Sequence, residues 1–307
     1  MVKVGIMVDR VPTYAILADR ALLRISGLDA KEFLQGLISN DTRRLAPNQA
    51  LYAAFLTPQG KYLHDFFLAE RDEIVFLDCE AARRADLKRR LTLHRLRSKV
   101  AVEEADPALA TYAVFGPGAL AALGLRHEAG AAVPLGSGIA YADPRLAGAG
   151  GRAILAADEA AGIFAARGIA AATGKAYDRW RLELGLPDGS RDIDVDKSVL
   201  LECGFEDLRG VDFAKGCYMG QEVTARTKYR GLVKRRLVPV AIDGPAPARG
   251  TPLMLGDVEA GEMRSSAGDV GLALIRLERL QEAVSQGRPL TADGVRLTPR
   301  KPDWATF

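Results

Sequence analysis

Two apolar runs on either side of a short turn constrain the fold of this chain more than any other feature. Leu51 to Leu56 is predicted to be a strand, Thr57 to Gly60 a hairpin turn, and Tyr62 to Ala69 the returning strand. Further strands are predicted at Ala21 to Ile25 and Ile74 to Leu77. Strands joined by so short a turn pair antiparallel. Together with the helices predicted around them, they indicate an α+β fold with helices on one face.

Helices are predicted before and after this hairpin. Asp29, with Glu32 three residues later, forms a capping-box pattern for a short helix. Asp78 is expected to begin a basic helix that runs to about Leu96. Later helices are predicted at three further ranges: Asp158 to Arg167, Lys175 to Leu184 and Gln221 to Lys228.

The sequence pattern changes at two points, at Gly185 and after Gly231. Gly185 to Asp212 lacks sustained periodicity and is predicted to be a long irregular loop, which in a compact protein is often functional. After Gly231, short alternating apolar segments lie between glycine and proline turns, and this pattern predicts a small all-β domain.

Composition excludes several classes of protein. The 307 residues suggest roughly two domains, and 48% hydrophobic residues with a net charge of +3 exclude disorder as the main state. So small a net charge does not identify a nucleic-acid binder. Three cysteines indicate a reducing compartment, and the sequence shows no secretory signal or membrane-spanning run. We therefore expect a cytoplasmic protein of bacterial type, or a mitochondrial matrix protein in a eukaryote.

The densest chemical signal is a segment that leads into the last predicted helix: Lys215-Gly216-Cys217-Tyr218-Met219-Gly220-Gln221-Glu222. A thiol just before a helix lies near the positive end of the helix dipole, and Lys215 and Arg226 would add positive charge. Both effects would favour the thiolate of Cys217 as a nucleophile or a metal ligand. The alternative, which composition alone favours, is a small buried residue in a tight turn. No cluster of histidines and cysteines has the spacing of a metal site.

This segment resembles the signature of the YgfZ proteins, a folate-binding branch of the superfamily of the glycine-cleavage T-protein, an aminomethyltransferase. The resemblance extends over almost the whole chain, in these further segments: Asn40-Asp41 with Leu51-Tyr52, Thr57 to Asp65, Arg181-Leu182-Glu183 and Arg235 to Val238. It implies a monomer with an aminomethyltransferase-like ring of three subdomains around a folate cavity. Residues 1–232 would form the folate-binding region, with a second subdomain centred on about 105–175, and residues 233–307 would form a C-terminal β-barrel.

The resemblance also implies roles for individual residues. Asp65 matches the aspartate that faces the reactive nitrogens of tetrahydrofolate, where a carboxylate stabilises a developing cation. Glu183 matches the glutamate that binds the pterin ring through two parallel hydrogen bonds. Tyr52 would stack on or border the folate, and Asn40 is a weaker match. Each residue also has a plainer interpretation. Asp65 would face solvent and Glu183 would be a charge on a helix surface. Tyr52 would be a core aromatic and Asn40 would close a turn.

The chain departs from the T-protein in two places. The T-protein segment Gly-Tyr-Thr-Gly-Glu-Asp-Gly corresponds here to Asp143 through Gly151, without the tyrosine and the acidic pair. The T-protein also does not need a cysteine where Cys217 stands. Both departures argue against aminomethyl transfer and leave open whether the protein is an enzyme. Both fit the YgfZ branch, which is associated with iron–sulfur cluster assembly or repair and with tRNA thiolation.

The leading hypothesis is an accessory protein that binds tetrahydrofolate or a one-carbon derivative and serves iron–sulfur client or carrier proteins. Cys217 would be its reactive thiol or a transient ligand for iron or a cluster. One alternative is a folate-dependent one-carbon (aminomethyl) transferase. A further alternative is a tRNA-modification factor that uses basic clusters within Arg83 to Lys99 and Lys228 to Arg236. The plainer interpretation of each cluster is a solvated helix face.

Overall fold

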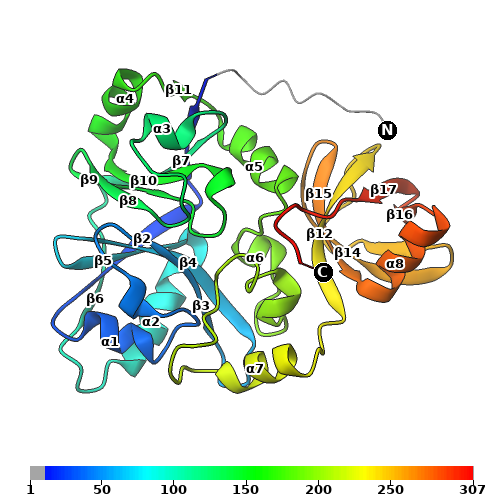
Figure 1. Ribbon diagram of the computed structural model, residues 1–307, viewed down its shortest axis with the longest axis horizontal. Coiled ribbons are helices and arrows are strands. Elements are labelled where there is room, and N and C mark those ends of the chain that lie inside the picture. The colour runs from blue at the N-terminus through cyan, green and yellow to red at the C-terminus, as the bar shows by residue number, and fades with distance from the viewer. Residues whose placement is uncertain (1–10, 307) are drawn as a thin grey trace. The chain divides into compact units, whose positions relative to one another are not determined.

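The computed structural model describes residues 11–306, which divide into two compact units (Figure 1). Unit one contains the described residues up to Leu28, together with Arg44–Leu51 and Phe67–Tyr177. Unit two contains Asp29–Arg43, Tyr52–Phe66 and the residues from Asp178 onward. Each unit is therefore built from segments that are far apart in the sequence.

Unit one contains a six-stranded sheet with the strand order β11-β1-β7-β10-β9-β8. Its strands are β1 (Thr13–Ile16), β7 (Leu109–Phe115), β8 (Ala132–Leu135), β9 (Gly138–Ala142), β10 (Gly151–Ala156) and β11 (Ala170–Ala171). Two helices, α3 (Ala119–Ala122) and α4 (Ala157–Ala166), contribute Leu120 and Phe164 to the core beside this sheet. The Phe164 ring lies 4.3 Å from that of Tyr14 and 5.4 Å from that of Tyr112, centroid to centroid.

The same unit holds a second group of antiparallel strands. Strand β2 (Arg20–Ser26) pairs with β5 (Ile74–Glu80) on one side and with β6 (Ala101–Glu104) on the other. After β5, a 3₁₀ turn at Ala81–Arg83 leads into helix α2 (Arg84–His94).

The prediction that Asp78 begins this basic helix is wrong. Asp78 lies inside β5, and its fully buried carboxylate accepts hydrogen bonds from Nε of Arg20 at 2.8 Å and Nε of Arg152 at 3.2 Å. A buried carboxylate needs such partners. Arg20 comes from β2, which pairs with β5, and Arg152 comes from β10 of the six-stranded sheet. Pairing with two guanidinium groups therefore keeps this polar residue in the sheet, and the strand continues to Glu80.

Unit two begins with helix α1 (Ala30–Gln35) and contains most of the predicted hairpin. Asp29 occupies the N-cap position of α1 but makes no side-chain capping hydrogen bond, so the capping-box prediction is wrong. Strand β3 (Leu51–Leu56) has the predicted bounds, and β4 (Tyr62–Arg71) returns beside it. The turn is closed by a hydrogen bond of 2.8 Å from Gly60 N to Thr57 O, with Gly60 at φ 73°.

The stretch predicted to be a long irregular loop is compact. It follows helix α5 (Gly174–Glu183) and contains helix α6 (Gly189–Asp192) and a 3₁₀ helix at Leu200–Cys203. Arg181, which is 2% exposed, forms ion pairs with Asp178 and Asp192. Its Nη2 also donates a hydrogen bond of 2.7 Å to Oγ of Ser265. These buried polar contacts bind α5 to α6 and to the C-terminal strands.

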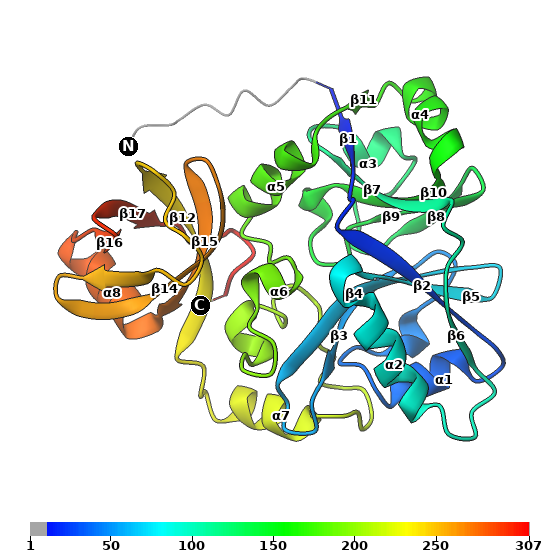
Figure 2. The ribbon, with the colours of Figure 1, turned by 180° about the vertical axis from the view of Figure 1, so that it is seen from behind.

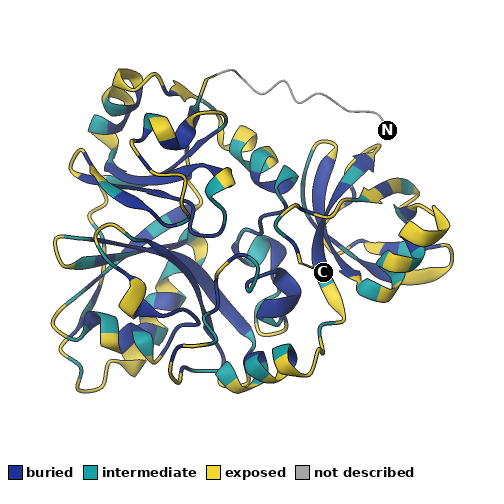
Figure 3. Ribbon diagram, in the orientation of Figure 1, coloured by how far each residue is buried: buried dark blue, intermediate teal, exposed yellow. Residues whose placement is uncertain are grey.

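The C-terminal part of unit two is a closed six-stranded barrel with the strand order β12-β15-β14-β13-β16-β17. The strands are β12 (Arg235–Asp243), β13 (Pro252–Leu255), β14 (Val258–Ala267), β15 (Val270–Arg276), β16 (Leu290–Ala292) and β17 (Val295–Pro299). Helix α8 (Leu277–Gln286) was not expected, and it packs Leu280 and Ala283 against the barrel core (Figure 2). In β15 every residue except Arg276 is buried, and Figure 3 shows this strand largely in dark blue. The α+β class and the prediction of short strands after Gly231 are confirmed, but helix α8 means that this region is not all-β.

No helix within residues 11–306 is both long enough and apolar enough to cross a membrane.

Candidate functional site

The segment from Lys215 to Glu222 holds one exposed thiol between two buried anchors. Lys215 is 8% exposed and Tyr218 is 9% exposed, whereas Gly216 and Cys217 between them are exposed. Helix α7 (Gln221–Tyr229) begins three residues after Tyr218. The sequence-based alternative of a buried cysteine in a tight turn is therefore wrong for Cys217.

Lys215 is held by the last residue of α1 and by the segment that follows this helix. Its ammonium nitrogen donates hydrogen bonds to the backbone carbonyls of Gln35, Ile38 and Asn40, at 2.8, 2.6 and 2.8 Å. The last carbonyls of a helix lack partners within the helix, so the lysine satisfies that of Gln35. Burial lowers the pKa of Lys215 to about 8, while the carboxylate of Asp41 opposes this shift. At pH 7 the lysine therefore still carries its charge, and each of its N–H bonds finds an acceptor.

The second glycine of the segment allows α7 to approach the hairpin turn (Figures 1 and 2). Gly220 has φ 81°, and a Cβ built on it would lie 2.5 Å from the carbonyl oxygen of Thr57. Gly60 on the turn is equally crowded, because its Cβ would lie 2.7 Å from Cβ of Val223. Gly216, in contrast, has no such neighbour within 4 Å. Crowding thus explains Gly220 but not Gly216, which lies beside the exposed thiol.

The other polar members of the segment have separate roles. The side-chain oxygen of Gln221 accepts a hydrogen bond of 3.2 Å from the backbone N–H of Tyr218. Glu222 is exposed on the first turn of α7 and pairs with Arg226. Lys215 and Arg226, which were expected to add positive charge near Cys217, are both engaged by other groups.

The two remaining cysteines are buried in other environments. Cys79 lies in β5 with its thiol 3.4 Å from the carbonyl oxygen of Ala21. Cys203 is 3% exposed, and burial raises the pKa of its thiol to about 12. Cys217 is the one exposed thiol among the described residues. Those residues also contain no group of three or more histidine, cysteine, aspartate or glutamate side chains arranged to hold a metal ion.

Asp65 is buried, not solvent-facing, and two phenols hold its carboxylate. The hydroxyl of Tyr52 donates to Oδ2 at 2.9 Å, and the hydroxyl of Tyr62 donates to Oδ1 at 2.5 Å. Asp65 itself is 4% exposed. The Tyr52 ring stacks on Phe205 with centroids 5.0 Å apart. The structure thus gives this carboxylate donors suited to its ionised form. The sequence did not identify Tyr62, because it left open which hairpin side chains point to the same side as Asp65. Phe205 was not identified either, since it lies far from the hairpin in the sequence.

Asn40 connects this group to Lys215. Its side-chain nitrogen donates hydrogen bonds of 2.7 Å to the carbonyl oxygens of Tyr52 and Arg209, and its backbone oxygen accepts one from Lys215. Asn40 therefore fixes the backbone of β3 and of the segment after η4 (Leu200–Cys203), a structural role. These hydrogen bonds join Asn40, Tyr52, Asp65 and Lys215 into one network.

Glu183 lies outside that network. It is the last residue of α5, its side chain is 13% exposed, and its Oε1 lies 2.9 Å from Nε of Arg179. Arg179 also pairs with Asp269, in the turn before β15. Only one oxygen of Glu183 is engaged by Arg179.

Ion pairs neutralise much of the two basic clusters. In the first cluster Arg84 and Lys88 pair with Glu104, and Arg89 and Arg90 pair with Asp86. In the second, Lys228 pairs with Glu206 and Arg235 pairs with Glu202. This pairing agrees with the plainer interpretation of solvated, locally neutralised faces.

Comparisons with known proteins agree with this architecture. The model of the GCVT N-terminal domain matches residues 18–129, and that of the CAF17 C-terminal β-barrel domain matches residues 234–307. The mitochondrial iron–sulfur cluster assembly factor IBA57 of Homo sapiens is 35% identical over 310 residues, which cover 93% of this chain and 83% of that protein. The mitochondrial IBA57 homolog of Aspergillus clavatus is 31% identical over 336 residues, covering 93% and 74%.

A solved structure shows the same fold. The crystal structure of the glycine cleavage system aminomethyltransferase T from Bartonella henselae aligns with a TM-score of 0.74 at 16% sequence identity. The alignment covers 96% of this chain and 86% of that chain. The expectation of an aminomethyltransferase-like α+β fold with a C-terminal β-barrel is thereby confirmed.

Proposed function

Because this chain belongs to the family of the IBA57 iron–sulfur cluster assembly factors, we propose that Cys217 supplies a thiolate ligand to a cluster on its way to a client protein. The observation that carries the proposal is the contrast among the thiols. Cys217 is exposed, whereas Cys79 and Cys203 are buried. A ligand that must meet a cluster held by another protein has to be accessible.

The anchoring of the segment supports the same role. Lys215 and Tyr218 are buried on either side of Gly216 and Cys217, and Lys215 makes three hydrogen bonds to backbone carbonyls between Gln35 and Asn40. The thiol is therefore presented at a defined position, although it is exposed. Positions held in this way lose less conformational entropy when they bind a partner.

A single thiol cannot complete a cluster site, since iron–sulfur clusters are commonly held by about four cysteine ligands. Residues 11–306 contain no further cysteine that is exposed, and no group of potential ligands surrounds Cys217. We therefore propose that the remaining ligands come from a carrier or client protein. The cluster would be shared between the two chains during transfer.

The decisive experiment is complementation in cells that lack this protein. The activity of iron–sulfur enzymes is measured with the parent, with Cys217→Ser and with Cys79→Ser as the matched control. Serine at position 79 retains a hydroxyl that can donate to the Ala21 carbonyl. We expect Cys79→Ser to restore the enzyme activities and Cys217→Ser to leave them low. Full restoration by Cys217→Ser would remove the ligand role.

We further propose that unit two binds tetrahydrofolate, with Asp65, Tyr52 and Glu183 as contacts. The match of the GCVT N-terminal domain and the chemistry of the donor set support this assignment. Asp65 is a buried carboxylate held by Tyr52 and Tyr62, so it is suited to a cationic centre. Glu183 engages Arg179 through Oε1, and a carboxylate has lone pairs for further donors. Tetrahydrofolate, when bound, would supply nucleophilic nitrogens or a one-carbon group.

Anaerobic titration with tetrahydrofolate tests the folate proposal. The parent is compared with Glu183→Gln and with Glu222→Gln. The second variant is the control, because it makes the same substitution at an exposed glutamate. We expect saturable binding that weakens about tenfold or more in Glu183→Gln and is unchanged in Glu222→Gln. Absence of binding at about millimolar ligand would contradict the proposal and leave the role of Cys217 unaffected.

A further inference from the structure

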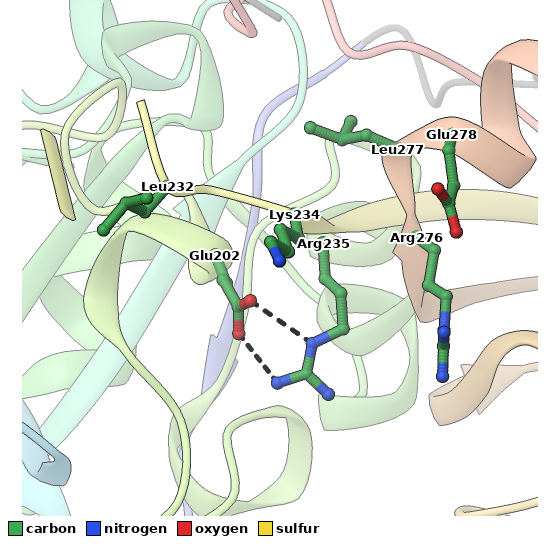
Figure 4. Close-up of a pocket in the computed structure, with 7 residues that line it drawn as sticks. All are labelled: Glu202, Leu232, Lys234, Arg235, Arg276, Leu277 and Glu278. Atoms are coloured by element: carbon green, nitrogen blue, oxygen red, sulfur yellow. Dashed lines mark hydrogen bonds and ion pairs between the residues drawn. The ribbon is translucent and has the colours of Figure 1, made fainter. Parts of the chain in front are cut away.

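A surface pocket of about 690 Å³ lies where the barrel meets the preceding segments of unit two (Figure 4). It is lined by Glu202, Leu232, Lys234, Arg235, Arg276, Leu277 and Glu278. These residues come from the 3₁₀ helix before α7, the segment between α7 and β12, the start of β12, the end of β15 and the start of α8. The volume is in the range of small-molecule and peptide sites. None of the residues proposed above for cluster or folate chemistry lines it.

Positive charge in this pocket is only partly neutralised. Arg235 is paired with Glu202, through Nη2 at 2.9 Å and Nε at 3.3 Å. Lys234 and Arg276 are exposed and have no hydrogen-bond or ion-pair partner for their side chains among residues 11–306. Arg235 lies directly opposite Arg276 in the antiparallel pairing of β12 with β15. Like charges at such positions destabilise the pair, so these two arginines are an unfavourable arrangement for folding alone.

The start of α8 adds a second unfavourable feature. Arg276 occupies the N-cap position of this ten-residue helix and makes no side-chain capping hydrogen bond. Capping positions favour serine, threonine, aspartate or asparagine, and a cation at the positive end of the helix dipole is unfavourable. The first N–H of the helix, that of Leu277, donates to the carbonyl of Lys234 at 2.9 Å. Glu278 in the first turn offsets only part of the positive potential.

An arginine opposite another arginine, and an arginine at a helix N-cap, both suggest that an anionic partner from outside the chain binds here. We propose that this pocket binds an acidic peptide segment, presented by another protein. Lys234 and Arg276, which Figure 4 shows on either side of Arg235, would each pair with an acidic side chain of that segment through charge-assisted hydrogen bonds. Figure 4 shows Arg235 between Lys234 and Arg276, with Leu277 and Leu232 at the side of the basic group.

The residues that line the pocket favour a peptide over a nucleic acid as the ligand. Leu232, which is 47% exposed, and Leu277 offer apolar surface to a hydrophobic residue beside the carboxylate. The lining contains no aromatic side chain on which a base could stack. The ligand class is therefore a short segment that alternates acidic and apolar residues.

Calorimetric titration of the full chain with a synthetic peptide tests this proposal. The probe is an acetylated and amidated hexapeptide of alternating glutamate and leucine, and its counterpart has glutamine for glutamate. We expect saturable binding of the glutamate peptide at submillimolar concentration and much weaker binding of the glutamine peptide. Arg276→Ala and Lys234→Ala should each weaken binding about tenfold. The matched control is Arg296→Ala, which removes an exposed arginine from a smaller pocket of the same barrel.

Three outcomes would overturn the proposal. The first is equal binding of the two peptides, and the second is binding that is as sensitive to Arg296→Ala as to Arg276→Ala. The third is a single-stranded oligonucleotide that binds more tightly than the peptide and is lost in the Arg276 variant, which would make phosphate the ligand. Cys217→Ser should bind the peptide like the parent, so the result is independent of the proposed cluster chemistry.

Discussion

Gly220 and Gly60 approach so closely that a Cβ on Gly220 would lie 3.0 Å from the Cα of Gly60. Both residues have positive φ angles, 81° and 73°. The first turn of α7 therefore rests directly on the hairpin turn between β3 and β4. This contact ties the segment that carries Cys217 to the hairpin that carries Asp65.

The close approach predicts a large difference between the two glycines of the segment. Gly220→Ala adds a Cβ 2.5 Å from the Thr57 carbonyl at a left-handed φ, so it should lower the free energy of unfolding by at least about 2 kcal/mol. Gly216→Ala meets no atom within 4 Å and should change it by less than about 0.5 kcal/mol. Urea unfolding of both variants checks this. Equal stability losses would contradict the packing argument.

Lys215 is expected to stabilise the fold independently of any chemistry at Cys217. Lys215→Met leaves the carbonyls of Gln35, Ile38 and Asn40 without their shared donor, so it should cost about 3 kcal/mol of unfolding free energy. The control is Lys61→Met, which removes a half-buried lysine whose ammonium donates a hydrogen bond of 3.0 Å to the Lys197 carbonyl. That variant should cost less than about 1 kcal/mol. A Lys215 variant as stable as the parent would show that water replaces the ammonium group.

The three cysteines should differ sharply in reactivity. Under native, reducing conditions, iodoacetamide should modify Cys217 first, because it is exposed. Cys203 should stay protected until the protein unfolds, since it is 3% exposed and burial raises its pKa to about 12. Cys79 is buried as well. Peptide mapping by mass spectrometry after a short reaction gives the order. Early modification of Cys203 would contradict the described burial.

Asp41 should make stability depend on pH in the acid range. Hydrogen bonding to Arg43 lowers the pKa of Asp41 from 3.8 to about 2. Because the folded pKa is below the unfolded one, the stabilisation is fully present above pH 3.8 and is lost as the pH falls toward 2. Asp41→Asn should remove this part of the acid dependence. Carbon-13 NMR titration of the Asp41 carboxyl measures the pKa directly, and a midpoint near 3.8 would refute the prediction.

Turn residues and hydrophobic periodicity were sufficient to predict the hairpin and the strands of the C-terminal region. The bounds of β3 were predicted to the residue, because an apolar run ends at a Thr-Pro-Gln-Gly turn whose glycine has the required positive φ. The alternating segments after Gly231 likewise predicted strands, which form a closed barrel, but they gave no sign of helix α8. Local signals failed at Asp29, which makes no side-chain capping bond, and at Asp78, which belongs to a strand and not to a helix start.

For the candidate site, the residues that stand out could be named from the amino-acid order: the segment from Lys215 to Glu222, its cysteine, and the carboxylate of Asp65. The folded chain was needed to show that Asp65 faces two phenols, that Lys215 binds the Ile38 carbonyl, and that Cys217 is exposed. Folding also brings Arg276 opposite Arg235. The two kinds of information differ in the sequence distance over which they act. Turn chemistry and periodicity act within a few residues, whereas burial and charge pairing depend on contacts such as that between Lys215 and Ile38, 177 residues apart.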